Sequence, residues 1–216
     1  MRLDLHCHTR HSRDSLMTFD ALLRRMDRRG MDMVAITDHN TITGALAFHA
    51  RAPERFVVGE EIKTTCGELI ALFLKEEVPP GLSPEETIAR VHAQGALVGA
   101  SHPLDRWRGE ALGMENLESI RRKLDFLEVF NARMTFSNDN RLAREMAARW
   151  GLPGSAGSDA HAPSEVGRAY VDMPAFDGPQ DFLDSLSLGQ IGGRLSSPFV
   201  HFYSTYAKWR KRLEAR

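Results

Sequence analysis

The chain of 216 residues is 42% hydrophobic and 26% charged, which is typical of a soluble domain large enough to bury a core. Its formal net charge of −1 gives no indication of a nucleic-acid or membrane partner. Only two cysteines are present, Cys7 and Cys66, which excludes a disulfide framework and a cysteine-rich zinc site. No apolar run approaches the ~20 residues needed to span a bilayer. The sequence shows no signal-peptide pattern, so a cytoplasmic protein is expected.

The first predicted strand carries two histidines on one face. Side chains alternate along a strand, so His6 and His8 point together while Leu3 and Leu5 anchor the strand in the core. Imidazole nitrogens are ligands for zinc, iron, manganese and copper. The pair alone is a weak indication of a metal site. The indication is stronger because later predicted strands also end in residues that can bind metals.

Helices and strands alternate through the next hundred residues. Apolar residues recur at helical spacing from Phe19 to Met26, and Gly30 is expected to end that helix. The strand at 33–36 is followed by Asp38 and His39, and the strand at 56–58 by Glu60 and Glu61. The next strand, 68–74, can form a hairpin with 62–64. A capping box at 83–86 then predicts the start of a helix.

The second half continues the alternation. The strand at 96–100 ends before His102, the strand at 126–130 ends before Arg133, and a helix is predicted over 139–150. Such spacing indicates βαβ units in a parallel sheet. Because each strand ends in polar side chains, we expect a β/α barrel whose site lies at the carboxyl ends of its strands.

The tail, residues 198–216, combines aromatic and basic side chains. We expect a C-terminal helix packed on a barrel formed by residues 1–197. The alternative is that this tail contacts nucleic acid.

The candidate site residues lie at or just after these strand ends. Each alone has an ordinary explanation as a loop or helix cap, but burying so many imidazoles and carboxylates together is costly unless cations pair them. Mixed nitrogen and oxygen ligands without thiolate suit two or three divalent ions such as manganese, zinc or iron. The candidates are His6, His8, Asp14, Asp38, His39, Glu60, Glu61, His102, Asp159 and His161.

Five motifs in this order resemble those of the PHP superfamily, named for polymerase and histidinol phosphatase. They are His6-x-His8, Thr37-Asp38-His39-Asn40, Gly59-Glu60-Glu61-Ile62, Ser101-His102-Pro103 and Gly157-Ser158-Asp159-Ala160-His161. The resemblance implies a distorted (β/α)7 TIM-like barrel. It also implies a metal-dependent phosphoesterase with up to three metal ions.

The resemblance also assigns the ligands residue by residue. His6, His8, Glu61 and Asp159 would hold one metal, and Glu61 would bridge to a second bound also by His102. A third would be held by Asp14, His39 and His161, and Glu60 replaces Glu61 if the register is off by one.

One position departs from the family pattern. Many members have a histidine where this chain has Ile70, or in the loop beyond it, and isoleucine cannot ligate a metal. The second metal would then be weakly held, absent, or completed by water or a nearby group. Cys66 is one candidate substitute, although a plain buried thiol is the simpler reading.

The implied reaction is hydrolysis of a phosphate ester by a hydroxide held between metals, with Glu61 and Asp159 central to it. Asp38 is a candidate acid for the leaving group, and Arg133 and Arg168 are candidate phosphate ligands with surface ion pairs as their alternative roles. The expected partner is a small phosphorylated metabolite or nucleotide. A nuclease acting on DNA or RNA ends and a non-catalytic metal-binding scaffold are the alternatives, and the balanced charge argues against a stable nucleic-acid partner.

Overall fold

A single curved sheet forms the centre of the protein in the computed structural model, which describes residues 1–105, 107 and 109–214. Nine strands of the described residues pair in the order β7-β6-β5-β4-β3-β2-β1-β8-β9. They are β1 (Arg2–Cys7), β2 (Met33–Ile36), β3 (Phe56–Lys63), β4 (Glu68–Leu72), β5 (Leu97–Ala100), β6 (Phe126–Asn131), β7 (Gly154–Gly157), β8 (Ala169–Asp172) and β9 (Gln190–Gly193).

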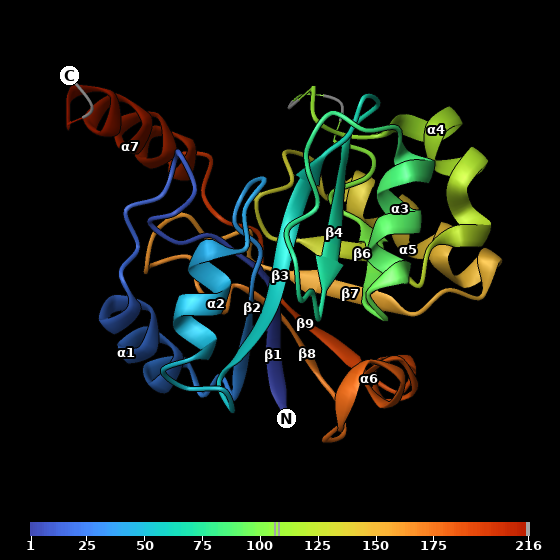
Figure 1. Cartoon of the computed structure of the whole chain (residues 1–216), viewed down its shortest axis with the longest axis horizontal. Helices are drawn as coiled ribbons and strands as arrows, with labels where there is room; N and C mark the ends of the chain where they lie inside the picture. Colours follow the sequence, from blue (N-terminus) through green and yellow to red (C-terminus); the bar gives the residue numbers. More distant parts are fainter. Residues whose placement is uncertain (106, 108, 215–216) are drawn as a thin grey trace.

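Helices cover the outside of this sheet. In Figure 1, α1 and α2 lie on one side, α3, α4 and α5 on the other, and α7 lies apart at the top left. A short 3-10 helix, Arg121–Lys123, follows α4. The α-helices are α1 (Phe19–Arg29), α2 (Thr43–His49), α3 (Pro84–Ala93), α4 (Gly113–Ile120), α5 (Ser137–Trp150), α6 (Gly178–Ser187) and α7 (Val200–Glu214).

The first seven strands curl until β7 returns to β1, so the sheet is nearly closed. Cys7 and Ala160 form an isolated bridge there, and the Asp159 N–H donates to the His6 carbonyl at 2.8 Å. Gly157 permits this approach, because a Cβ at that position would lie 2.1 Å from the His6 Cβ. The predicted distorted β/α barrel is therefore confirmed.

Strand β4 runs opposite to both of its neighbours. It pairs antiparallel with β3, with Glu61 opposite Ile70 and Lys63 opposite Glu68, and antiparallel with β5. The predicted hairpin is confirmed. Because β4 is reversed, it begins at the rim where the parallel strands end.

The sequence reading missed three elements after residue 168. Strands β8 and β9 continue the sheet beyond β1 as an antiparallel hairpin-like pair, and α6 lies between them. The β9 strand is partly exposed and contains Gly192 and Gly193, so it shows neither the alternation nor the residue types that mark a strand.

Local signals set the helix ends where they were expected. Gly30 ends α1 in the left-handed conformation with φ of 61°, and its N–H donates to the Asp27 and Met26 carbonyls. Ser83 and Glu86 form the full capping box of α3, with Pro84 at the first helical position. Both predictions are confirmed.

Apolar side chains form two clusters, one on each face of the sheet. The outer cluster joins the sheet to helices α1 to α5, for example through Met26 and Phe56. The inner cluster fills the barrel and includes Leu5, Ile70 and Phe182 of α6. Burying a side chain of this size contributes about 1.5–3 kcal/mol, so the two clusters fix the strand ends in place.

The tail forms a helix, as expected, over Val200–Glu214. Only Ser204 and Ala207 of α7 are buried, and the helix is held largely by polar contacts. Lys211 Nζ donates to the Arg10 carbonyl at 2.6 Å and also to the Ser12 carbonyl. The domain division at residue 197 stays a prediction. None of the helices in the described residues is both long and apolar enough to span a bilayer.

Candidate metal centre

Polar side chains from several strand ends meet at the rim of the barrel around a pocket of about 240 Å³. Strands and loops supply one wall, and α7 supplies the other. The pocket is lined by Asp14, His39, Glu61, His102, Glu110, Arg133, Asp159, His161, His201, Ser204, Thr205 and Lys208.

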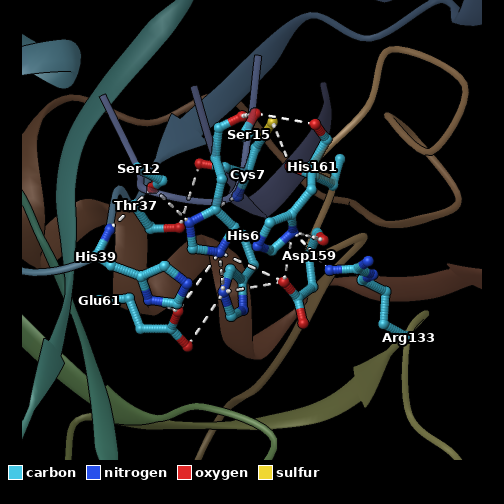
Figure 2. Close-up of polar contacts among 12 residues, drawn as sticks. His6, Cys7, Ser12, Ser15, Thr37, His39, Glu61, Arg133, Asp159 and His161 are labelled. Atoms are coloured by element: carbon cyan, nitrogen blue, oxygen red, sulfur yellow. Dashed lines mark hydrogen bonds and ion pairs between the residues drawn. The ribbon is translucent and has the colours of Figure 1, made fainter. Parts of the chain in front are cut away.

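Two imidazoles and two carboxylates form the deepest cluster (Figure 2). The Nε2 atoms of His6 and His8 lie 3.1 Å apart, and both face Glu61, at 3.3 Å from Oε1 and 3.4 Å from Oε2. Asp159 Oδ1 lies 3.3 Å from His8 Nε2 and 3.8 Å from His6 Nε2. Nitrogen and oxygen donors of four residues therefore meet here, and single donor atoms of His6, His8 and Glu61 all lie within 4.8 Å of one another, as a cation site requires.

Buried Glu128 orients His6. Its carboxylate accepts from His6 Nδ1 at 3.0 Å, from the His102 backbone N–H at 2.6 Å and from Asn131 Nδ2 at 3.1 Å. An ionised carboxylate only accepts, so Nδ1 carries a proton, and Nε2 is the nitrogen left to bind a cation.

Ser12 orients His8 in the same way. Its hydroxyl donates to Asp38 Oδ1 at 2.6 Å, so it accepts from His8 Nδ1 at 3.1 Å and from the His39 backbone N–H at 3.0 Å. The proton on His8 Nδ1 leaves Nε2 available as a ligand. Asp38 also accepts from the Thr9 N–H and hydroxyl, both at 2.6 Å.

A second group gathers on the other side of Glu61. His102 Nε2 lies 3.0 Å from Glu61 Oε1 and 3.6 Å from Glu68 Oε2. His39 Nδ1 lies 3.0 Å from Glu61 Oε2 and 3.8 Å from Glu68 Oε1. Glu61 thus lies between two groups of donors, which is the position of a bridging carboxylate.

A third group lies nearer the mouth. Asp14 faces His39 Nε2 at 3.5 Å and His161 Nε2 at 3.4 Å. Lys208 Nζ of α7 approaches the same carboxylate at 3.3 Å. Asp14, His39 and His161, which the resemblance assigns to a third metal, therefore lie close together in space.

Strained backbone accompanies two of these side chains. His102 has φ of 27° and Asp159 has φ of 52°, a left-handed region that non-glycine residues rarely occupy. Both residues follow directly on strand ends, and backbone hydrogen bonds to Glu128 and His6 hold them. Such strain concentrates at functional sites, where it aims side chains.

The cluster perturbs its own protonation equilibria. Burial works to raise the pKa of Glu61, but the positive charges of His6 and His39 hold it well below its usual range. Without a bound cation, burial opposes protonation of His6, but the carboxylates of Glu61, Glu128 and Asp159 raise its pKa well above the usual value, so a metal at Nε2 would displace a proton. Burial and the charge of Glu61 raise the pKa of Glu68 to about 8.

The donor set fits divalent cations. It offers imidazole nitrogens and carboxylate oxygens without thiolate, which suits borderline ions such as manganese, iron and zinc. Two buried carboxylate oxygens, Asp14 Oδ1 and Glu68 Oε2, accept no hydrogen bond from the described residues. Imidazole nitrogens approach these oxygens at 3.4 and 3.6 Å, and a bound cation would give each buried oxygen a closer positive partner.

Asp38, Glu60 and Arg168 make their contacts away from the metal-ligand candidates, and their predicted roles stay predictions. The Asp38 carboxylate is saturated by the loop that it organises, through Thr9 and Ser12. Arg168 lies outside the barrel, near Arg25 of α1. Burial and the charge of Arg29 lower the pKa of Arg25, and the charge of Arg168 lowers it further. Glu60 points away from the site, and its Oε2 accepts from the Val78 N–H at 3.0 Å.

Arg133 lines the pocket, but its guanidinium is already engaged. Nη1 lies 2.7 Å from His161 Nδ1, Nε lies 3.0 Å from Glu165 Oε2, and Nη2 donates to the Val200 carbonyl and the Ser204 hydroxyl. A bidentate clamp on phosphate would require some of these contacts to break. Arg133 therefore holds α7 to the barrel through Val200 and Ser204. Figure 2 shows Arg133 beside Asp159 and His161.

Sequence reasoning missed three participants. Glu68 could have been found from the predicted hairpin, because a reversed strand begins at the rim. Glu128 lies on a predicted strand, but its orienting role depends on contacts with His6 and His102, which are distant in sequence and which no local pattern identifies. Lys208 reaches the pocket through the packing of α7, which the sequence does not specify.

Comparisons with known proteins agree with this geometry. A family model described as the PHP domain matches residues 4–94, and a PHP-associated model matches residues 137–191. An uncharacterized protein of Methanocaldococcus jannaschii, MJ0417, is 36% identical over 198 residues, which cover 87% of this chain and 80% of that protein.

Solved structures share the fold at low sequence identity. PsfC from Pseudomonas syringae gives a TM-score of 0.69 at 18% identity, over 98% of both chains. A two-domain protein of Bacteroides vulgatus that contains a predicted PHP-like metal-dependent phosphoesterase gives 0.72 at 15% identity, over 96% of this chain and 69% of that one.

The fold is therefore that of PHP-like metal-dependent phosphoesterases. The chain belongs to the PHP family, as its motifs indicated.

Proposed function

We propose that this protein is a metal-dependent phosphoesterase that hydrolyses a small phosphorylated metabolite or a nucleotide. The observation that carries the proposal is the meeting of donor atoms from His6, His8, Glu61 and Asp159. Two further groups of donors lie beside them: one shares Glu61, and the other shares His39, which contacts Glu61. The proposed cofactors are two or three divalent ions, manganese, zinc or iron.

The chain's residues prepare this centre in two ways. Glu128 and Ser12 fix the tautomers of His6 and His8, so that both Nε2 atoms are ligands without rearrangement. Glu61 and Asp159 bring negative charge between the imidazoles. Bound divalent ions would supply Lewis-acid activation of water and neutralise charge on the phosphoryl oxygens.

The opposite wall supplies cationic groups for the substrate. Lys208 Nζ lies at the pocket, 3.3 Å from Asp14 Oδ2, so its ammonium can bind an anionic oxygen there. Thr205 and His201 of α7 line the same wall. A phosphate group would thus lie between the metal ligands and α7.

A nuclease acting on short single-stranded ends is the second candidate. Exposed Phe202, Tyr206 and Trp209 alternate along α7 with Lys208 and Arg210, next to the pocket. Aromatic side chains interleaved with basic ones are typical of surfaces on which nucleobases stack. The balanced net charge of the chain favours a small substrate over long nucleic acid.

A screen that measures release of inorganic phosphate and, for oligonucleotides, release of nucleotides separates these candidates. The protein would be loaded with manganese, iron or zinc and tested on histidinol phosphate, nucleoside bisphosphates and short oligonucleotides. We expect turnover of at least one small phosphate ester, lost in Asp159→Asn. Activity on oligonucleotides alone would favour the nuclease, and no release from any substrate by any loaded form would contradict the proposal.

A further inference from the structure

The second donor group lacks a ligand at the position that the family pattern provides. Ile70 occupies that position in β4, and its side chain is 2% exposed within the inner apolar cluster. Without a replacement, the protein would offer only Glu61 and His102 to a second ion. Two ligands hold a divalent ion less firmly than the three to four that protein sites commonly supply.

Glu68 lies two residues before Ile70 on the same face of β4. Side chains at i and i+2 of a strand share a face, so Glu68 stands above Ile70 toward the rim. Its carboxylate spans the gap between two imidazoles, with Oε2 at 3.6 Å from His102 Nε2 and Oε1 at 3.8 Å from His39 Nδ1. His102 Nε2 also lies 3.0 Å from Glu61 Oε1, so both carboxylates approach the same imidazole nitrogen.

The Glu68 carboxylate is buried without a close hydrogen-bond donor. The residue is 3% exposed, and Oε2 accepts no hydrogen bond within the described part of the chain; its imidazole neighbours lie 3.6 and 3.8 Å from the two oxygens. A buried carboxylate beside a second carboxylate, with imidazoles beyond hydrogen-bond distance, leaves a position that a cation would fill.

We infer that Glu68 replaces the absent histidine and completes the second metal site together with Glu61 and His102. This inference rests on the metal dependence of the proposed function. The reversed direction of β4 makes the replacement possible, because the first residue of an antiparallel strand lies level with the last residues of its parallel neighbours.

The replacement changes the chemistry of the site. Two carboxylates and one imidazole make an oxygen-rich ligand set, whereas a histidine at position 70 would make a nitrogen-rich one. Oxygen ligands favour manganese, and nitrogen ligands favour zinc. The second site of this protein should therefore prefer manganese more strongly than a site with histidine at that position.

The test compares manganese content and affinity in four forms of the full chain, by elemental analysis after dialysis and by calorimetric titration. The wild type is compared with Glu68→Gln, with the double variant Glu68→Ala/Ile70→His, and with Glu60→Gln as the matched control. Glu60 is a buried residue of β3 whose pKa is raised to about 8, mainly by burial. Its side chain faces away from the site.

We expect Glu68→Gln to lose one manganese ion, or to bind it at least tenfold more weakly, while the remaining ions and the Glu60→Gln variant match the wild type. The double variant should regain an ion with its preference shifted toward zinc. Equal ion number and affinity in Glu68→Gln and the wild type would overturn this assignment alone. A wild type that binds fewer than two ions would overturn both the assignment and the proposed metal-dependent function.

Discussion

Replacing Glu128 by glutamine should disable the first metal site without touching any of its ligands. The Glu128 carboxylate accepts from three donors: His6 Nδ1 on one oxygen, and the His102 N–H and Asn131 Nδ2 on the other. A glutamine has one oxygen and one NH2 group. It satisfies the greater number of donors by turning its oxygen toward His102 and Asn131, so its NH2 faces His6.

That orientation forces His6 into the other tautomer. Nδ1 must then accept from the glutamine, and the proton moves to Nε2, the atom that faces Glu61 at 3.3 Å and His8 at 3.1 Å. A protonated Nε2 cannot ligate a metal. Loss of such an orienting partner typically weakens metal affinity 10–100-fold, which corresponds to about 1.4–2.7 kcal/mol.

Competition of a metal-sensitive dye with the purified protein would measure this change. We expect the tightest manganese site of Glu128→Gln to weaken by that factor, with the protein still folded by circular dichroism. Asn138→Asp, a change at an exposed position near the start of α5, serves as a control for charge substitution. An unchanged affinity of the tightest site in Glu128→Gln would refute the tautomer argument.

Three further predictions concern the pocket wall, the ions and the surface. Lys208→Met should raise KM about tenfold, or ~1.4 kcal/mol, with little change in kcat or metal content. Arg212→Met, a change at an exposed position of the same helix, should change none of these. Equal KM values in Lys208→Met and the wild type would contradict a role of Lys208 in substrate binding. Chelation should lower the Tm, because ions present at a hundred times their Kd stabilise by about 2.7 kcal/mol per site; a Tm insensitive to chelator would argue against bound ions. Asp172→Asn should cost about 0.5 kcal/mol at pH 7, because the hydrogen bond from Arg2 lowers the Asp172 pKa. Stability from a depressed carboxyl pKa is lost as pH falls through that pKa, so urea unfolding near pH 2 should no longer distinguish the variant.

The fold was largely predictable because its signals are local. Periodic apolar residues, Gly30 and the capping box at Ser83 define helices within a few residues, and polar strand ends indicate a barrel. The pair β8 and β9 was not predictable in this way. Those short strands are stabilised by pairing with β1 and with each other, and glycines in β9 remove the side-chain pattern.

Site residues at strand ends could be predicted from the sequence, whereas residues whose position depends on tertiary packing could not. The structure brings His6, His8, Glu61 and Asp159 together as the motifs implied. Asp38 follows a strand in the same way, yet its carboxylate turns to the loop backbone at Thr9 and Ser12, and no sequence pattern distinguishes these two outcomes.

The two walls of the pocket are encoded in different parts of the sequence. The family models match residues 4–94 and 137–191, while α7 starts at Val200 and contributes its own wall through His201, Thr205 and Lys208. Under the proposed function, α7 would contact the substrate without supplying a metal ligand. Substitutions on this helix would then change which phosphate ester binds while the metal ligands stay the same.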